Sequence, residues 1–323
     1  MILEWNKINK PIIALSPMAD MTDSPFCQIV KEVTGESDYP VMFREMVSSE
    51  AVVRGNEKTL DMTEIDPSER PLVQQIFGSD PEIMAQSAAI IAHDHKPEGF
   101  DINMGCPVYK ITHNFNGCAL MNDPDRACDI VKAMKALINV PLSVKIRLGW
   151  SDKNTCLTFA PKLEQAGANL ITVHGRTKAQ GYSGVSDWAQ IAEVKKVVSV
   201  PLLANGDIHT PESVIKALEI TKADGVLIAR GALGNPWFFK QAKDLIETGK
   251  YEVPSFEERI NVVKRHFDLH VQKYGDHGVY TFRKHLQWYF KGMENAKHIK
   301  EKFNNAKIVS EMHDAFHALS NNF

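Results

Sequence analysis

Cysteine is scarce in this chain, and no two cysteines are close enough in sequence to form a familiar motif. The 323 residues include five, at positions 27, 106, 118, 128 and 156. An odd number without a Cys-x-x-Cys pair indicates neither a disulfide framework nor a zinc site. We therefore expect no bound metal and a reducing compartment, which favours the cytoplasm.

Long apolar runs are also missing, since none in the sequence has the length needed to cross a bilayer. The first seven residues lack the basic region and the apolar stretch of a signal peptide. We expect no association with membranes. Nothing in the sequence implies a protein partner, and a monomer is the default expectation.

An excess of positive charge is absent from the chain as a whole, whose formal net charge is −3. Residues 250–323 differ from this average, with 12 Lys and Arg against 9 Asp and Glu and with seven of the twelve histidines. A mildly basic helical segment is most often a solvated surface, so charge alone does not identify a partner.

Eight short apolar runs, rich in Val, Ile and Leu, recur with helical segments between them. They span residues 11–15, 41–46, 72–77, 100–103, 142–147, 170–174, 202–205 and 225–229. Such runs are typical of a parallel sheet that is buried on both faces. Eight alternations predict an α/β fold, the (β/α)8 or TIM barrel. A doubly wound sheet is the alternative, but no strand is followed by a Gly-x-Gly-x-x-Gly turn.

The pattern changes after about residue 250, where no further strand is predicted. Residues 256–274, 279–291 and 296–318 have the composition of helices. We therefore expect two domains, a catalytic barrel over residues 1–248 and a small all-helical domain over residues 249–323.

Cys106 lies in a short polar loop after the fourth predicted strand. Gly105 before it allows a close backbone approach, and Pro107 after it favours an extended conformation. A lone cysteine is more often an ordinary buried residue. Here, however, Asn103 and Lys110 place an amide and an ammonium group in the same loop, and Asn114 follows, which favours a reactive site.

Lys145 is on the fifth predicted strand, in Leu142-Ser143-Val144-Lys145-Ile146-Arg147. The period of two places the three apolar side chains on one face and Lys145 with Arg147 on the other. In a barrel the second face is the interior, where a lysine is costly without an anionic partner. A cofactor would supply that partner, and an ion pair with Glu45 is the structural alternative.

The loops after the seventh and eighth strands are the usual phosphate site of such barrels. They read Asn205-Gly206-Asp207 and Ala229-Arg230-Gly231. Glycines let backbone N–H groups approach a phosphate, and the guanidinium adds positive charge. Each loop alone is consistent with a plain turn, whereas the pair together favours a phosphorylated cofactor.

Several motifs, in this order along the chain, resemble those of the tRNA-dihydrouridine synthase family. The motifs are Ser16–Asp23, Gln75–Pro81, Asp101–Lys110, Val144–Trp150, Val173–Thr177, Ala204–Ile208, Ala229–Trp237 and Arg283–His285 with Trp288-Tyr289. The resemblance covers essentially the whole chain and lies nearest to the bacterial B branch. Asp20 departs from the family pattern, in which glycine is more usual, and Ala229 stands where glycine is common.

The resemblance implies FMN as the cofactor, NADPH as the electron donor and tRNA as the partner. Cys106 matches the family's proton donor. The implied cofactor contacts are Pro17, Met18, Ala19, Gln75, Lys145, His174, Asn205, Gly206, Asp207, Ala229 and Arg230. The candidate contacts with the uridine or the tRNA are Asn103, Lys110, Asn114, Arg176, Arg283 and Lys284.

The implied reaction reduces the C5–C6 double bond of a D-loop uridine. Hydride from the flavin adds at C6, and a proton must then add at C5. A free thiol has a pKa of about 8.5, so it is mostly protonated at neutral pH and can serve as the acid. The uridine must leave its stack to be reached, and the basic helical segment would bind the tRNA backbone.

Three other functions are consistent with parts of the pattern. The first is an FMN-dependent barrel that reduces a free pyrimidine or another small enone, which would not need the basic helical segment. The second is an RNA-binding module without catalysis, which would not need the flavin motifs. The third is an aldolase that forms a Schiff base at Lys145, which trapping with borohydride would reveal.

Overall fold

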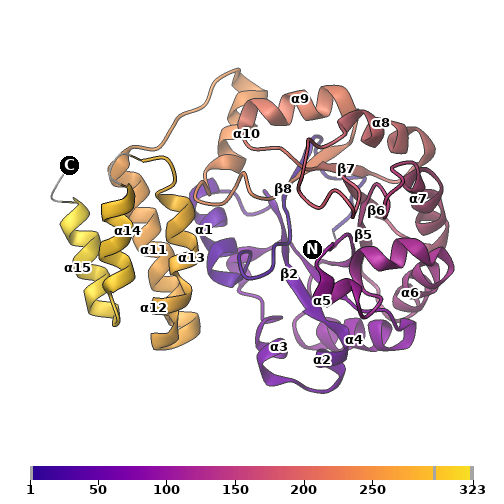
Figure 1. Ribbon diagram of the computed structural model, residues 1–323, viewed down its shortest axis with the longest axis horizontal. Coiled ribbons are helices and arrows are strands. Elements are labelled where there is room, and N and C mark those ends of the chain that lie inside the picture. Colours follow the sequence, from indigo (N-terminus) through magenta and orange to yellow (C-terminus); the bar gives the residue numbers. More distant parts are fainter. Residues whose placement is uncertain (1–2, 294–295, 321–323) are drawn as a thin grey trace.

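The computed structural model describes residues 3–293 and 296–320, and it shows a barrel with a bundle of helices at one side (Figure 1). The eight strands pair in sequence order, all in parallel, and β1 closes the barrel against β8. They are β1 Ile12–Leu15, β2 Val41–Ser48, β3 Leu72–Phe77, β4 Gly99–Met104, β5 Leu142–Arg147, β6 Leu170–His174, β7 Leu202–Asn205 and β8 Gly225–Ile228. The predicted TIM barrel is confirmed, and closure rules out the doubly wound sheet.

Helices cover the outside of the barrel. They are α1 Ser24–Thr34, α4 Pro81–Asp94, α6 Pro124–Leu137, α7 Thr155–Ala166, α8 Trp188–Val197, α9 Pro211–Thr221 and α10 Phe238–Thr248. Asp80 caps the start of α4, where it accepts hydrogen bonds from Glu82 N and Ile83 N, and Pro81 occupies the first helical turn. Such caps satisfy N–H groups that have no partner within the helix.

Short helices interrupt the barrel pattern at two loops. Between β2 and β3 lie α2 Ser49–Val53, α3 Glu57–Asp61 and the 3-10 helix Pro67–Glu69. After β4 lie α5 Tyr109–Thr112 and the 3-10 helix Gly117–Asn122. The segment after β4 adjoins Cys106, because Cys118 N donates to Cys106 O at 3.1 Å.

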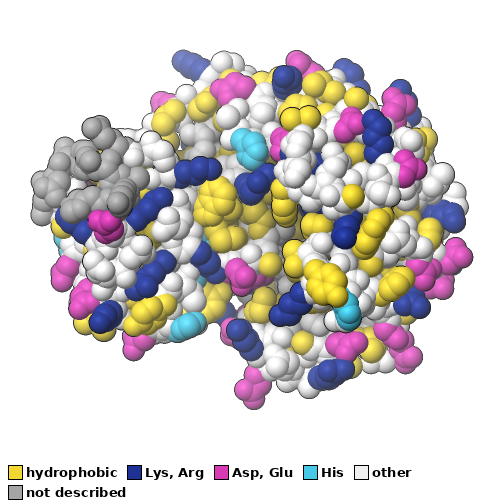
Figure 2. Space-filling model, in the orientation of Figure 1, with side chains coloured by type: hydrophobic (Ala, Val, Ile, Leu, Met, Phe, Trp, Pro, Cys, Tyr) yellow, Lys and Arg dark blue, Asp and Glu magenta, His cyan; other side chains and the backbone are white. Residues whose placement is uncertain are grey.

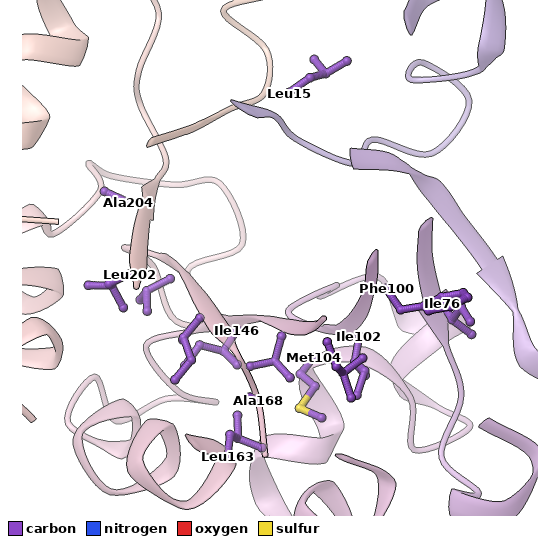
Figure 3. Close-up of a cluster of buried hydrophobic side chains, with 14 of the residues drawn as sticks. Leu15, Ile76, Phe100, Ile102, Met104, Ile146, Leu163, Ala168, Leu202 and Ala204 are labelled. Carbon is purple, nitrogen blue, oxygen red and sulfur yellow. The ribbon is translucent and has the colours of Figure 1, made fainter. Parts of the chain in front are cut away.

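The core has two layers because the strands are buried on both faces. The larger layer packs the outward side chains of the strands against the covering helices, and Figure 3 shows part of it, including Ile102 and Ile146. Leu142, Val144 and Ile146 all belong to this layer, so the predicted period of two on β5 is confirmed. The inner layer fills the barrel with residues such as Phe43 and Leu227.

Helices follow the barrel to the end of the described chain. They are α11 Phe256–Tyr274, the 3-10 helix Gly275–His277, α12 Gly278–Thr281, α13 Arg283–Tyr289, α14 Ala296–Asn305 and α15 Val309–Ser320. The two helices predicted over 279–291 and 296–318 are instead each divided, the first into α12 and α13 and the second into α14 and α15. These helices bury a core of their own, with Phe267, Phe282 and Phe316 among its members.

The helical region packs against α1 of the barrel, mainly through α11. Ion pairs flank this contact, with Arg265 bonded to Glu32 and Lys273 bonded to Asp61 and Glu64. The division into domains over 1–248 and 249–323 stays a proposal, which the end of α10 at Thr248 supports. Within the described residues, no helix combines the length and apolarity required to span a membrane.

Candidate active site

The Cys106 loop is held by a side chain at the end of its own strand. The Asn103 Oδ1 atom accepts hydrogen bonds from Gly105 N at 3.2 Å and from Cys106 N at 2.9 Å. From the neighbouring strand, Arg147 Nε donates to Gly105 O at 2.8 Å. The half-buried Cys106 thiol therefore sits on a backbone that is fixed from two sides.

A series of hydrogen bonds between buried side chains fixes the position of Asn103. Asn103 Nδ2 donates to Gln75 Oε1 at 2.9 Å, and Gln75 Nε2 donates to Asp101 Oδ2 at 2.6 Å. Ser143 Oγ donates to the other Asp101 oxygen at 2.6 Å. The network spans β3, β4 and β5, so it couples the position of Cys106 to the barrel interior.

Asp101 makes the stability of this network depend on pH. Burial raises the pKa of Asp101 to about 6, against the opposing effect of its hydrogen bonds from Gln75 and Ser143. A carboxyl whose pKa is higher in the folded state favours folding below its unfolded pKa, near 4, and this contribution is lost as pH rises through about 6. Two pKa units correspond to roughly 3 kcal/mol.

We expect Asp101→Asn to remove this dependence. Between pH 4 and 7, urea unfolding of the wild type should lose roughly 3 kcal/mol of stability that the variant does not lose. Comparing the two proteins cancels the titration of other groups. Parallel pH profiles would show that Asp101 is ionised throughout and would contradict this interpretation.

Lys145 lies beside this network and has no ion pair or hydrogen bond to another described residue. Burial and the neighbouring Arg147 lower the pKa of Lys145 to about 8, although Asp101 opposes this shift. The alternative partner Glu45 is engaged elsewhere, because its Oε2 atom accepts a hydrogen bond from Asp20 N at 2.6 Å. A half-buried ammonium group without an anion is the kind of site that an anionic ligand stabilises.

The hydrogen bond between Asp20 N and Glu45 helps this chain to have aspartate at a position where the family more usually has glycine. Asp20 has φ 61°, in the left-handed region that favours glycine. Its N–H group is fixed by the Glu45 carboxylate, which helps to compensate for the unfavourable backbone angle.

His174, Arg176 and Asp207 form a second network at the ends of β6 and β7. Arg176 is buried and bonds Asp207 Oδ2 at 2.7 Å, and its Nη1 atom lies 3.3 Å from His174 Nε2. Because a guanidinium group only donates, His174 Nε2 must accept. Burial and the surrounding cations, Lys145 first among them, lower the pKa of His174 well below its usual range. The imidazole is therefore neutral.

Tyr182, which the sequence analysis missed, overlies these groups. It lies in the loop between β6 and α8, with its ring 5.5 Å from the Arg147 guanidinium and 5.2 Å from that of Arg230. The side chain is 60% exposed. Its position between Gly181 and Gly184 indicated a loop, but the stacking depends on contacts from distant strands.

Lys145, His174 and Tyr182 are among the residues that line one cavity at the carboxyl ends of the strands. It contains nine of the eleven predicted cofactor residues, namely Pro17, Met18, Lys145, His174, Asn205, Gly206, Asp207, Ala229 and Arg230. Ala19 and Gln75 are not among its lining residues, and all eleven cofactor contacts stay predictions. Ser16, Tyr182, Ile208, His209 and Leu227 complete the lining.

The cavity fits a phosphate group near its β7 and β8 side. Gly206 has φ 106°, and an added Cβ would lie 2.6 Å from Ser186 Oγ, so a glycine is required there. Among the described residues, the N–H groups of Gly206 and Arg230 have no acceptor. Together with the partly exposed Arg230 guanidinium, they could bind phosphate oxygens.

The predicted substrate contacts are found in different surroundings. Lys110 and Asn114 are exposed on the rim after β4, next to Tyr109, which is 74% exposed. Asn103 and Arg176 are buried and support the loops described above. Arg283 donates to Ala306 O at 2.8 Å within the helical region, whereas Lys284 is half-buried and makes no hydrogen bond to another described residue.

A wide cleft of about 740 Å³ separates the barrel rim from the helical region. It shares His209 and Arg230 with the cavity and continues over Arg259, Trp288 and Lys291. Figure 2 shows it as a hollow edged by Lys and Arg side chains. The cavity therefore opens into a cleft that carries both cations and aromatic surface.

A closed parallel barrel, with its polar cavity across the carboxyl ends of the strands, defines the class: this is a TIM-barrel enzyme. A family model described as dihydrouridine synthase (Dus) matches residues 13–323. The chain belongs to the dihydrouridine synthase family and is therefore an oxidoreductase. The membership that the motifs predicted is confirmed.

Similar proteins cover nearly the whole chain. A probable tRNA-dihydrouridine synthase 1 from Synechocystis is 38% identical over 302 residues, which are 93% of this chain and 83% of that protein. A tRNA-dihydrouridine synthase B from Pasteurella multocida is 36% identical over 295 residues, 90% of this chain and 87% of that one. A synthase B from Pseudomonas syringae is 38% identical over 300 residues, 90% and 86% of the two chains.

Two solved structures share the fold at low identity. An old yellow enzyme homologue from Zymomonas mobilis has a TM-score of 0.53 at 12% identity, over 79% of this chain and 96% of that one. A histamine dehydrogenase from Rhizobium has a TM-score of 0.57 at 10% identity, over 83% of this chain and 50% of that one. They show a common barrel architecture.

Proposed function

We propose that this enzyme is a tRNA-dihydrouridine synthase, nearest to the B branch, that uses FMN reduced by NADPH to convert a D-loop uridine to dihydrouridine. One observation carries the proposal: Lys145 has no anionic partner among the described residues, and it lies in the cavity on the strand next to the Cys106 loop. Asn103 and Lys145 are register partners on β4 and β5, and Cys106 follows Asn103 by three residues. A cation for an anionic cofactor and a thiol for the substrate are thus neighbours.

The residues of the cavity suit FMN. The phosphate would lie against Gly206 and Arg230, and Lys145 would stabilise negative charge on the ring system. The neutral His174 imidazole can donate from Nδ1, since its Nε2 atom accepts from Arg176. When bound, the reduced flavin supplies the hydride that adds to C6 of the uracil ring.

Cys106 completes the reaction in this proposal. Once C6 has received hydride, the negative charge on the uracil is removed when C5 takes the thiol proton, so the C5–C6 double bond becomes a single bond. The hydrogen bonds of Asn103 and Arg147 to the loop backbone hold the thiol in a fixed position, which general acid catalysis requires. The thiolate is protonated again from water.

The cleft would bind the tRNA. A nucleotide must leave its stack to reach a cavity at the bottom of a protein cleft, and aromatic surface such as Trp288 can receive unstacked bases. Lys284 and Lys291 are candidate phosphate contacts, while Arg283 is occupied by Ala306 O and is better placed to support α13.

Neutralising these two lysines tests the cleft. We expect Lys284→Ala with Lys291→Ala to raise the KM for tRNA several-fold and to reduce the salt dependence of binding by about two phosphate contacts. The rate at saturating tRNA should change little. Lys216→Ala, at an exposed position of α9 on the outside of the barrel, is the control. If Lys216→Ala raised the KM for tRNA as much as the double variant does, the effect would come from net charge, and the cleft would not be the tRNA site.

The function itself is tested by substrate choice. The FMN-loaded enzyme should consume NADPH steadily with tRNA that lacks dihydrouridine, and not with free uracil or orotate. Turnover of a free pyrimidine without activity on tRNA would favour the small-molecule barrel. The preference for NADPH over NADH, the monomeric state and the cytoplasmic location stay predictions.

A further inference from the structure

Four buried side chains meet where the helical region packs on the barrel. Asp23 is the N-cap of α1, His266 and His270 are four residues apart on α11, and His285 is on α13. One potential ligand atom from each lies within 4.8 Å of the others. All four side chains are at most 2% exposed. None of them belongs to the cavity or to the cleft described above.

The imidazole nitrogens that face this centre have no partner. His266 Nε2, His270 Nδ1 and His285 Nε2 are buried and make no hydrogen bond to another described residue. The nearest approach is His270 Nδ1 to Asp23 Oδ2 at 3.5 Å, which is longer than a normal hydrogen bond. Three unpaired nitrogens in one small buried space are unfavourable, so the arrangement requires something that binds them.

The second ring nitrogens of His266 and His270 each lie within hydrogen-bond distance of a hydroxyl group. His266 Nδ1 lies 3.1 Å from the Tyr289 hydroxyl, and His270 Nε2 lies 2.8 Å from Thr281 Oγ1. Asp23 is held in place as well, because its Oδ1 atom accepts from Phe26 N at 3.1 Å and its Oδ2 atom, which is also the one nearest to His270, accepts from the Tyr274 hydroxyl at 3.2 Å. In metal sites the second nitrogen of a histidine ligand is usually fixed by such a hydrogen bond, which orients the ring toward the ion.

We propose that Asp23, His266, His270 and His285 bind one zinc ion that fastens the helical region to the barrel. Three imidazole nitrogens and one carboxylate oxygen suit a late transition metal, and four protein ligands without solvent access are typical of a closed structural zinc site. Zinc–nitrogen distances of about 2.0–2.1 Å place tetrahedral ligand atoms about 3.3 Å apart. The observed separations are at most 4.8 Å, and His270 Nδ1 is already 3.5 Å from Asp23 Oδ2.

The chemistry of the four side chains suits this occupant. Zinc is bound by neutral imidazole and by ionised carboxylate, which are the forms that these residues provide when they act as ligands. One carboxylate balances half of the charge of Zn²⁺.

Metal analysis of the full-length, FMN-loaded protein without a polyhistidine tag tests the proposal. We expect one zinc ion per chain, and zinc-edge X-ray absorption with nitrogen and oxygen neighbours at about 2.0–2.1 Å and the outer-shell scattering of imidazole. His270→Gln and His285→Gln should each lose most of this zinc. His277→Gln, at an exposed position of the same region, should keep it.

Titration of the wild type makes the test independent of variant folding. After removal of metal with a chelator, adding Zn²⁺ should raise the melting temperature in a concentration-dependent way, and Mg²⁺ should not, since it prefers oxygen ligands. Zinc content and melting temperature that are the same with and without added zinc would overturn the proposal. So would zinc that persists in His270→Gln at the level of the His277→Gln control.

Discussion

Cys106→Ala is expected to lower dihydrouridine formation by about 10²–10⁴-fold while the protein still binds FMN, because general acid catalysis is typically worth that much. The thiol lies on the loop beside the cavity and is not among the cavity lining residues. Its removal should therefore leave the cofactor contacts intact. The Asn103 and Arg147 bonds go to backbone atoms of the loop, so the alanine variant should keep the loop conformation.

The measurement separates the two half-reactions. NADPH should reduce the flavin of Cys106→Ala at the wild-type rate, and oxidation of the reduced flavin by tRNA should be slow. Cys128→Ala is a matched control, because Cys128 is also half-buried but lies on α6, outside the cavity. Wild-type turnover by Cys106→Ala would remove this residue from the role of acid.

Lys145→Ala is expected to have the second large effect, on both cofactor and rate. Loss of a cation aimed at developing negative charge costs about 10²–10³-fold in turnover. Because the Lys145 ammonium group forms no ion pair with another described residue, an anionic ligand in the cavity would supply its direct partner. The dissociation constant for FMN should therefore rise at least tenfold.

Equilibrium titration with FMN, followed by single-turnover kinetics at saturating FMN, measures these effects separately. Lys178→Ala is the control, since Lys178 is a rim lysine that stacks on Trp150 at 4.1 Å and does not line the cavity. If Lys145→Ala has the same dissociation constant for FMN and the same single-turnover rate as Lys178→Ala, Lys145 does not bind an anionic cofactor.

The sequence predicted the barrel well because its signals are local. Apolar runs, the period of two on β5 and the Asp-Pro and Thr-Pro helix starts depend on neighbouring residues. All eight strands were predicted at the correct places, with ends that differ by at most two residues. The break between α12 and α13 was not predicted, because Phe282 there is a core residue of the helical region and follows the same apolar pattern.

The surroundings of long polar side chains were harder to predict. Arg176 and Arg283 are candidate contacts with the uridine or the tRNA, and each also bonds groups of its own fold. Gln75 is a candidate contact with the flavin, and its amide bonds Asp101 and Asn103. These roles stay predictions. The hydrogen-bond partners of these side chains come from distant parts of the sequence, so local sequence patterns do not predict them. The histidine cluster was missed for the same reason, since its four residues come from three separate elements.

Mapping the modified base in tRNA tests the central claim most directly. The purified enzyme, loaded with FMN and supplied with NADPH, is incubated with tRNA from a host that lacks dihydrouridine, and every reduced uridine is then located along the chain. We expect dihydrouridine at a defined D-loop position, formed by the wild type and lost in Cys106→Ala. Flavin binding and NADPH oxidation without any dihydrouridine in the tRNA would contradict it.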